Sequence, residues 1–175
     1  LPEVADYWES VVQLNTWQQH RIARLVVEKL FGTVTGKRLA VLGFAFKADT
    51  NDTREAPAIR ICGDLLEEGA QLAIHDPKVA AQQMVRDLQQ EAAPKADSLS
   101  GTGSWLQAGS VEEAVTGADA VLVLTEWQQY RVLNWINLAG LMRKPAWVFD
   151  ARAVADPERV RDAGLTLWRV GDGEA

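Results

Sequence analysis

The sequence has little cysteine, no excess of positive charge and no long apolar run. Cys62 is the only cysteine among 175 residues, so no internal disulfide can form, and we expect a reducing, cytoplasmic environment. The formal net charge of −6 argues against a general role in binding nucleic acid or a membrane surface. No apolar run approaches the roughly 20 residues that a membrane-spanning helix needs. An anionic ligand would need cations gathered at one place.

The chain begins LPEVADYWES, which lacks the basic and apolar segments of a signal peptide and also an initiator methionine. We therefore expect a processed or excised piece of a longer protein. Hydrophobic residues make up 47% of the chain, enough for the core of one domain with an appended element.

The first thirty residues carry a helical pattern. Apolar residues recur at spacings of three, four and seven, which predicts one amphipathic helix over about 3–31, ended by Gly32. A helix of this length is well above the mean of about 11 or 12 residues. It would join two domains or pack against another subunit through Trp8, Val12, Ile22 and Leu25.

Residues 33–175 alternate between strand and helix patterns, which predicts one α/β domain. We expect strands at 38–43, 71–76, 105–110, 119–125, 146–150 and 165–170, and helices at 55–68, 79–91, 110–117, 128–142 and 156–164, with a loop at 92–104. Such alternation is typical of a parallel sheet covered by helices, and the simplest topology is the Rossmann-like order 3-2-1-4-5-6.

In such sheets, ligands bind beyond the carboxyl ends of the strands, where the strand order reverses. The first strand leads to Phe46 and Lys47, the fourth to Thr125-Glu126-Trp127, and the fifth to Asp150 and Arg152. Lysine offers phosphate a compact charge, arginine can grip two oxygens, and a phenylalanine ring can cover a base or a sugar. In an acidic chain, this gathering predicts a phosphorylated ligand.

Each cation has a simpler interpretation. Lys47 could be an ordinary solvated loop lysine, and Arg152 could only pair with Asp150. Arg54 precedes a predicted helix start, where a positive charge is unfavourable to the helix dipole. That misfit favours a role for Arg54, although a local pair with Asp49 or Asp52 would also explain it.

The loop after the first strand does not fit a dinucleotide site. It contains one glycine, Gly43, where the NAD fingerprint needs three. Asp76 follows the second strand, where a Rossmann fold places its ribose-binding acid, but it lies further from Gly43 than the usual 20 or so residues. Aspartate before proline is common in turns, so we assign Asp76 a structural role.

Other residues with possible chemistry are interpreted as structural. Trp127 is expected to pack rather than to contact a ligand. His20 and His75 stand alone, with no metal-ligand spacing around them, so we expect no metal site. Cys62 lies within a predicted helix and is expected to be a buried small hydrophobe.

The stretch LAVLGFAFKADTNDTREAPAIRI at 39–61 resembles the opening of the C-terminal domain of the UDP-glucose 6-dehydrogenases. The segments HDPKV, TEW and FDAR resemble the same family in order and spacing, and residues 1–32 resemble the end of its long central helix. GFAFK with DTRE is the most specific part. Relatives acting on GDP-mannose or UDP-N-acetyl sugars carry altered loops, so this form favours UDP-glucose.

The resemblance implies a function. The family oxidises UDP-glucose twice to UDP-glucuronate with two NAD, using two Rossmann-like domains joined by a helix that also builds a dimer. By resemblance, Phe46, Lys47 and Arg152 would bind the substrate in the second domain, and Arg54 would reach across the cleft toward NAD.

The departures from the family pattern limit that function. The family's NAD fingerprint, catalytic cysteine and catalytic lysine lie upstream of the matched region, and Cys62 does not match the catalytic cysteine. The resemblance thus implies a substrate-binding part that is inactive alone and needs an N-terminal NAD-binding domain. Ala56 and Ala153 replace a usual serine and a frequent arginine, which would remove a helix cap and weaken the local positive field.

Two other functions remain open from the sequence. The chain could be a stand-alone module that binds a nucleotide sugar or mediates dimerisation through its long helix, or the equivalent domain of a related nucleotide-sugar dehydrogenase. An independent NAD-dependent oxidoreductase is disfavoured by the missing fingerprint.

Overall fold

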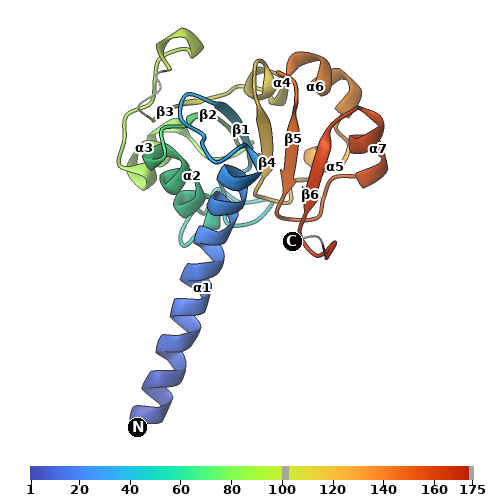
Figure 1. The fold of residues 1–175 in the computed structure, drawn as a ribbon. Helices are drawn as coiled ribbons and strands as arrows, with labels where there is room; N and C mark the ends of the chain where they lie inside the picture. Colours follow the sequence, from blue (N-terminus) through green and yellow to red (C-terminus); the bar gives the residue numbers. More distant parts are fainter. Residues whose placement is uncertain (100–102, 174–175) are drawn as a thin grey trace.

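The centre of the molecule is a sheet of six parallel strands in the order β3-β2-β1-β4-β5-β6 (Figure 1). The computed structural model describes residues 1–99 and 103–173. The strands are β1 (Arg38–Leu42), β2 (Gln71–His75), β3 (Ser104–Gln107), β4 (Ala120–Val123), β5 (Trp147–Asp150) and β6 (Thr166–Arg169). The predicted fold class and strand order are confirmed. The central strands β1 and β4 are almost wholly buried, which explains why their sequences are continuous apolar runs.

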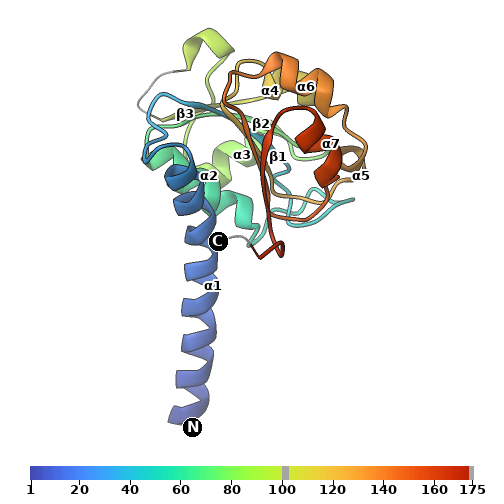
Figure 2. The same ribbon diagram turned by 45° about the vertical axis from the view of Figure 1, so that its right-hand side comes forward.

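Helices cover both faces of this sheet (Figures 1 and 2). The crossovers containing α2 (Pro57–Glu67) and α3 (Ala81–Leu88) run outward from β1, and those containing α4 (Val111–Val115), α6 (Trp135–Leu141) and α7 (Pro157–Asp162) run the other way. Because parallel crossovers are right-handed, the two groups lie on opposite faces. The strand order therefore reverses between β1 and β4, as predicted.

The chain begins with α1 (Pro2–Lys29), 28 residues long, close to the predicted range. Its last turns pack against α2 and bury Ala23 and Val26, while most of the helix projects beyond the carboxyl ends of the strands (Figure 1). Phe31 and Gly32 follow with positive φ angles of 67° and 82°, and the Gly32 amide donates to the Val27 carbonyl over 2.9 Å. This turn falls at the predicted boundary between 1–32 and 33–175, although the division into two parts stays a prediction.

The structure corrects two segments. The helix predicted over 128–142 is interrupted between α5 (Gln128–Arg131) and α6, because the Asn134 side chain caps α6 by accepting a hydrogen bond from the Asn137 amide over 3.1 Å. The predicted loop at 92–104 contains a short 3-10 helix, η1 (Ala96–Ser98), and its residues 100–102 lie outside the described part of the chain.

In the described ranges 1–99 and 103–173, no helix is both long enough and apolar enough to span a membrane.

Candidate functional site

Gly43 closes the junction between the ends of β1 and β4. Its φ is +98°, and a Cβ added there would lie 2.4 Å from the Thr125 Cβ. Thr125 is fully buried, and its hydroxyl donates to the Ala45 carbonyl over 2.8 Å. Gly43 is thus needed for a close approach of two loops. This explains why glycine stands at position 43 without any dinucleotide-binding role.

Asp76 holds the loops that follow β1 and β2. Its Oδ2 accepts from the amides of Phe44 and Ala45 over 2.8 and 2.9 Å, and from the indole Nε1 of Trp127 over 3.2 Å. Its Oδ1 accepts from the amides of Lys78 and Val79 over 2.9 and 3.1 Å. Both oxygens are therefore occupied. The structural roles of Asp76 and of the buried Trp127 are confirmed.

Phe46 and Lys47 lie at the surface of the same edge. Phe46 is 46% exposed, so about half of its ring lies outside the core. Lys47 is also exposed, and within the described residues its ammonium group has no hydrogen bond or ion pair. Both side chains are available to a ligand, which fits the predicted roles without testing them.

Arg152 reaches back from the end of β5 to the loops after β1 and β4. Its Nε donates to the Leu124 carbonyl over 3.1 Å and lies 3.0 Å from Glu126 Oε2, and its Nη2 donates to the Phe46 carbonyl over 2.9 Å. The alternative pair with Asp150 involves only the Arg152 amide, which donates to Asp150 Oδ1 over 3.1 Å. The Arg152 guanidinium therefore links three loops, while its side chain keeps 32% of its surface exposed.

Glu126 is a site residue that could not be assigned a role from sequence alone. Its Oε1 accepts from the Ala48 amide over 3.2 Å, while Oε2 pairs with Arg152. The sequence signal was its position in Thr125-Glu126-Trp127, directly after the fourth strand. An acid beside a proposed phosphate site is unfavourable by charge alone, which is why the pattern did not single it out.

Arg54 forms the local ion pair with Asp52 that was one of the two alternatives considered from the sequence. Its Nη2 lies 2.8 Å from Asp52 Oδ2, and its Nε donates to Asp52 Oδ1 over 3.0 Å. Hydrogen bonds from the side chain and amide of Arg54 lower the Asp52 pKa to about 2. The Arg54 side chain is nevertheless 88% exposed, so its outer face can meet a second partner. The predicted contact with NAD stays a prediction.

The loop that carries Arg54 is attached to α3. The Thr53 hydroxyl donates to Asp87 Oδ2 over 2.6 Å, and Gln83 Nε2 donates to the Asn51 carbonyl over 2.8 Å. At the other end of the loop, Ala56 begins α2 without a side-chain cap, as its departure from the family pattern implies.

Asp150 orders the loop after β5 as Asp76 orders the loop after β2. It is fully buried, and its Oδ2 accepts from the Ala155 amide over 2.8 Å. Arg169 supports the same turn, since its Nη2 donates to the Ala153 carbonyl over 3.2 Å. Ala153 has a φ of 55°, so this contact fixes a backbone conformation that a non-glycine residue rarely adopts.

The helix α1 forms one wall of a groove along this edge. A hollow of about 640 Å³ is lined by Phe46, Glu55, Ala56 and residues of α1 that include Gln18 and Gln19. An adjoining pocket of about 210 Å³ shares Gln18 and Gln19 and reaches Arg152. Gln18 and Gln19 were not predicted as site residues. A helical pattern shows which residues share a face of the helix, but not which loop that face will contact.

The remaining candidates are structural. Cys62 is fully buried, and burial raises the pKa of its thiol, so it is no nucleophile. Burial lowers the pKa of His75, and the His75 ring forms a hydrogen bond with the Tyr130 hydroxyl. His20 Nδ1 lies 2.6 Å from the Asp64 carboxylate. Across residues 1–99 and 103–173, no three His, Cys, Asp or Glu side chains gather as metal ligands.

The described residues do not fit an NAD site of their own. Gly43 is needed against Thr125, and both oxygens of Asp76 are taken by backbone amides and Trp127. The loop after β1 therefore has no glycine turn for a pyrophosphate, and the strand-end acid is not free for a ribose. The edge offers instead an exposed lysine, an exposed ring and a partly exposed arginine.

Comparison with known proteins likewise points to a UDP-binding domain rather than an NAD-binding one. Residues 40–157 match the model of the UDP-glucose/GDP-mannose dehydrogenase family, UDP binding domain. UDP-glucose 6-dehydrogenase 5 of Oryza sativa is 42% identical over 98% of this chain, and the UDP-glucose 6-dehydrogenase of Caenorhabditis elegans is 41% identical over the same share. The chain spans 37% and 35% of the lengths of these two relatives.

Solved structures agree with the sequence relatives. A UDP-glucose dehydrogenase from Pyrobaculum islandicum superposes with a TM-score of 0.66 at 26% identity, over 91% of this chain and 31% of that one. The resemblance carried by GFAFK and DTRE is confirmed. The chain belongs to the UDP-glucose/GDP-mannose dehydrogenase family, and the part of the family that it matches is the UDP-binding domain.

Proposed function

We propose that this chain is the UDP-glucose-binding part of an NAD-dependent UDP-glucose 6-dehydrogenase, which oxidises UDP-glucose twice to UDP-glucuronate. The observation that carries the proposal is the meeting of Phe46, Lys47 and Arg152 at one edge of the sheet, in a chain of net charge −6. The names of the relatives support the choice of substrate.

Each of these residues has a role suited to its chemistry. Lys47 neutralises the diphosphate, because its ammonium group is exposed and forms no hydrogen bond or ion pair among the described residues, although its charge contributes to lowering the Asp52 pKa. Arg152 contributes the exposed part of its guanidinium from the other side of the edge. Phe46 covers the apolar face of the base or the sugar.

The oxidation itself needs groups from elsewhere. The buried Cys62 cannot form a covalent intermediate, so an N-terminal NAD-binding domain supplies the nucleophile and holds NAD, which accepts the hydride. Arg54 extends from the edge toward that domain and contacts NAD. The enzyme works in the cytoplasm, where Cys62 stays reduced.

Calorimetric titration of this chain tests the proposal. UDP-glucose and UDP should bind, whereas NAD, as the control, should not. GDP-mannose should bind more weakly than UDP-glucose if the loop sequence selects the uridine nucleotide. Binding of NAD in preference to UDP-glucose, or of neither, would refute a self-sufficient substrate site.

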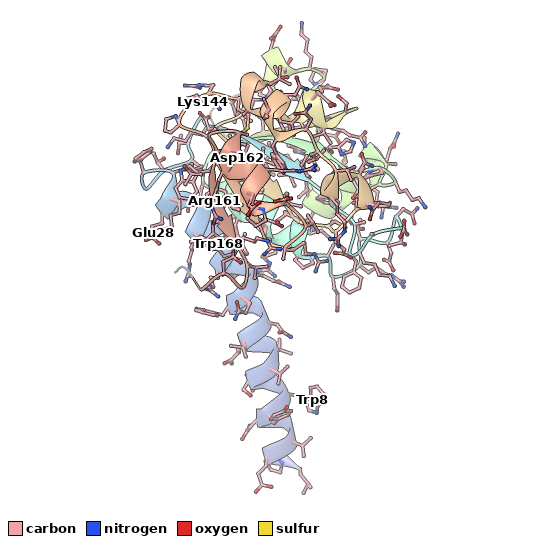
Figure 3. The ribbon with its side chains drawn as sticks, turned by 90° about the vertical axis from the view of Figure 1, so that its right-hand side faces the viewer. Trp8, Glu28, Lys144, Arg161, Asp162 and Trp168 are labelled. Atoms are coloured by element: carbon pink, nitrogen blue, oxygen red, sulfur yellow. The ribbon has the colours of Figure 1, made fainter. Side chains whose placement is uncertain are left out.

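A specific observation also favours dimerisation through α1. Tyr7, Trp8, Val12 and Trp17 are 50–62% exposed on the projecting part of the helix, and Figure 3 shows Trp8 pointing away from it. Ile22 and Leu25, the other two residues of the predicted contact set, are partly buried against the chain's own core, because the last turns of α1 lie on α2. The proposed contact is therefore centred on Trp8 and Val12, and the full set stays a prediction.

We expect a dimer in sedimentation experiments without ligand. Trp8→Glu should shift the protein toward monomer because it places a charge in an apolar contact. Ile136→Glu is the matched control, since Ile136 is 71% exposed on α6 and distant from α1. A monomeric wild-type chain would exclude this role.

A further inference from the structure

Lys47 is held on both sides by backbone contacts. The carbonyl of the preceding residue, Phe46, accepts from Arg152 Nη2 over 2.9 Å. The amide of the following residue, Ala48, donates to Glu126 Oε1 over 3.2 Å. The backbone position of Lys47 is thus fixed by one cation and one anion that come from the ends of β5 and β4.

Those two anchors are also tied to each other. Glu126 Oε2 lies 3.0 Å from Arg152 Nε, and each of the two side chains is 32% exposed. Glu126 therefore uses one carboxylate oxygen for the Lys47 loop and the other for Arg152. A glutamine cannot do both, because its single oxygen can face the Ala48 amide or Arg152, and its amide nitrogen then meets a donor at the other place.

We propose that Glu126 is a positioning residue for the nucleotide-sugar site, which sets Lys47 and Arg152 at the spacing that a diphosphate needs. This inference rests on the proposed function for its ligand, but the positioning itself is a property of the free chain. Glu126 does not touch the ligand. It acts through the backbone on one side of Lys47 and through the guanidinium of Arg152.

The direction of the effect separates positioning from simple charge. A carboxylate near a diphosphate repels it, so removing the charge of Glu126 should tighten binding if charge alone matters. If Glu126 positions the cations, its removal should weaken binding, because misplaced charges lose short, aligned hydrogen bonds to phosphate. The two accounts predict opposite signs.

The first measurement needs no ligand. In Glu126→Ala, amide exchange at Ala48 should become about tenfold faster and the NMR order parameters of Lys47 and Ala48 should fall, while amides in α7 stay unchanged. Glu158→Gln, an exposed change on α7, is the control and should leave the loop as in wild type. Wild-type exchange and order in Glu126→Ala would overturn the proposal.

The second measurement is calorimetric titration with UDP. Glu126→Gln should bind about tenfold more weakly than wild type, and part of that loss should vanish in a Lys47→Ala background, since Glu126 acts through Lys47 as well as through Arg152. Equal or tighter binding by Glu126→Gln would overturn the role. If wild type does not bind UDP, the proposed function fails, and the exchange measurement alone decides whether Glu126 positions the loop. That measurement can be repeated on Glu126→Gln if the alanine variant does not fold.

Discussion

The carboxyl-end edge of the sheet contains two sets of side chains that differ in burial and in partners. The frame consists of Gly43, Asp76, Thr125 and Asp150. The last three are at most 7% exposed, and their polar side chains are bonded to backbone groups. The rim consists of Phe46, Lys47 and Arg54, whose side chains are exposed to solvent. Arg152 connects the two sets, since it bonds to the Phe46 carbonyl and keeps a third of its side chain exposed.

This difference shows how an acidic chain can present cations. The buried carboxylates of Asp76 and Asp150 are satisfied by amides of the loops that they order, so they do not need the rim cations as partners. The charge of Lys47 is therefore available to a ligand. Frame variants should mainly change stability, and rim variants should mainly change binding.

The largest effect on stability is expected for Gly43→Ala. The added methyl group would lie 2.4 Å from Thr125 Cβ at a φ of +98°, so the free energy of unfolding should fall by about 4 kcal/mol from overpacking and backbone strain together. Chemical denaturation measures this. The matched control is Gly63→Ala in α2, where no atom lies within 4 Å of the added carbon, and it should stabilise by roughly 0.5–1 kcal/mol.

Asp76→Ala should have the next largest effect. It leaves four backbone amides and the Trp127 indole without their acceptor, and we expect a loss of about 3 kcal/mol in the free energy of unfolding. The Trp127 fluorescence should change as well. The control is Asp97→Ala, an exposed change in η1 that should stay within about 0.5 kcal/mol. A variant as stable as this control would show that Asp76 does not support the frame.

The rim variant Arg54→Ala should also change a local titration, with a smaller effect on stability than the frame variants. Arg54→Ala should raise the Asp52 pKa from about 2 toward the ordinary 3.8, because Arg54 supplies the hydrogen bonds that lower it. A carboxyl with a depressed folded-state pKa contributes stability above its unfolded pKa, and the contribution is lost as pH falls from about 4 through 2. An NMR titration of the Asp52 side chain checks this. An unchanged Asp52 pKa would mean that the pair does not form in solution.

The topology was predictable because the signals were local and repeated. Alternating apolar strands and helices fix a parallel sheet, and the rule of right-handed crossovers leaves few strand orders. The same rule brings the residues after β1, β4 and β5 to one edge. Phe46, Lys47 and Arg152 could thus be grouped before any contact was known.

The errors have physical causes of a different kind. The break before α6 depends on the Asn134 side chain, whose bond to the Asn137 amide competes with an apolar periodicity that continues through the segment. The role of Glu126 depends on side-chain direction, and its partners Ala48 and Arg152 lie far from it in sequence.

The central claim is that the rim binds a diphosphate through Lys47 while the frame carries the fold. The most direct test compares Lys47→Ala with Lys144→Ala, an exposed lysine at the opposite end of the domain from the projecting helix (Figure 3). Each variant is titrated with UDP-glucose and unfolded with denaturant. Lys47→Ala should bind at least about tenfold more weakly with stability unchanged within about 0.5 kcal/mol, and Lys144→Ala should match wild type in both. Equal binding by the two variants would contradict the account.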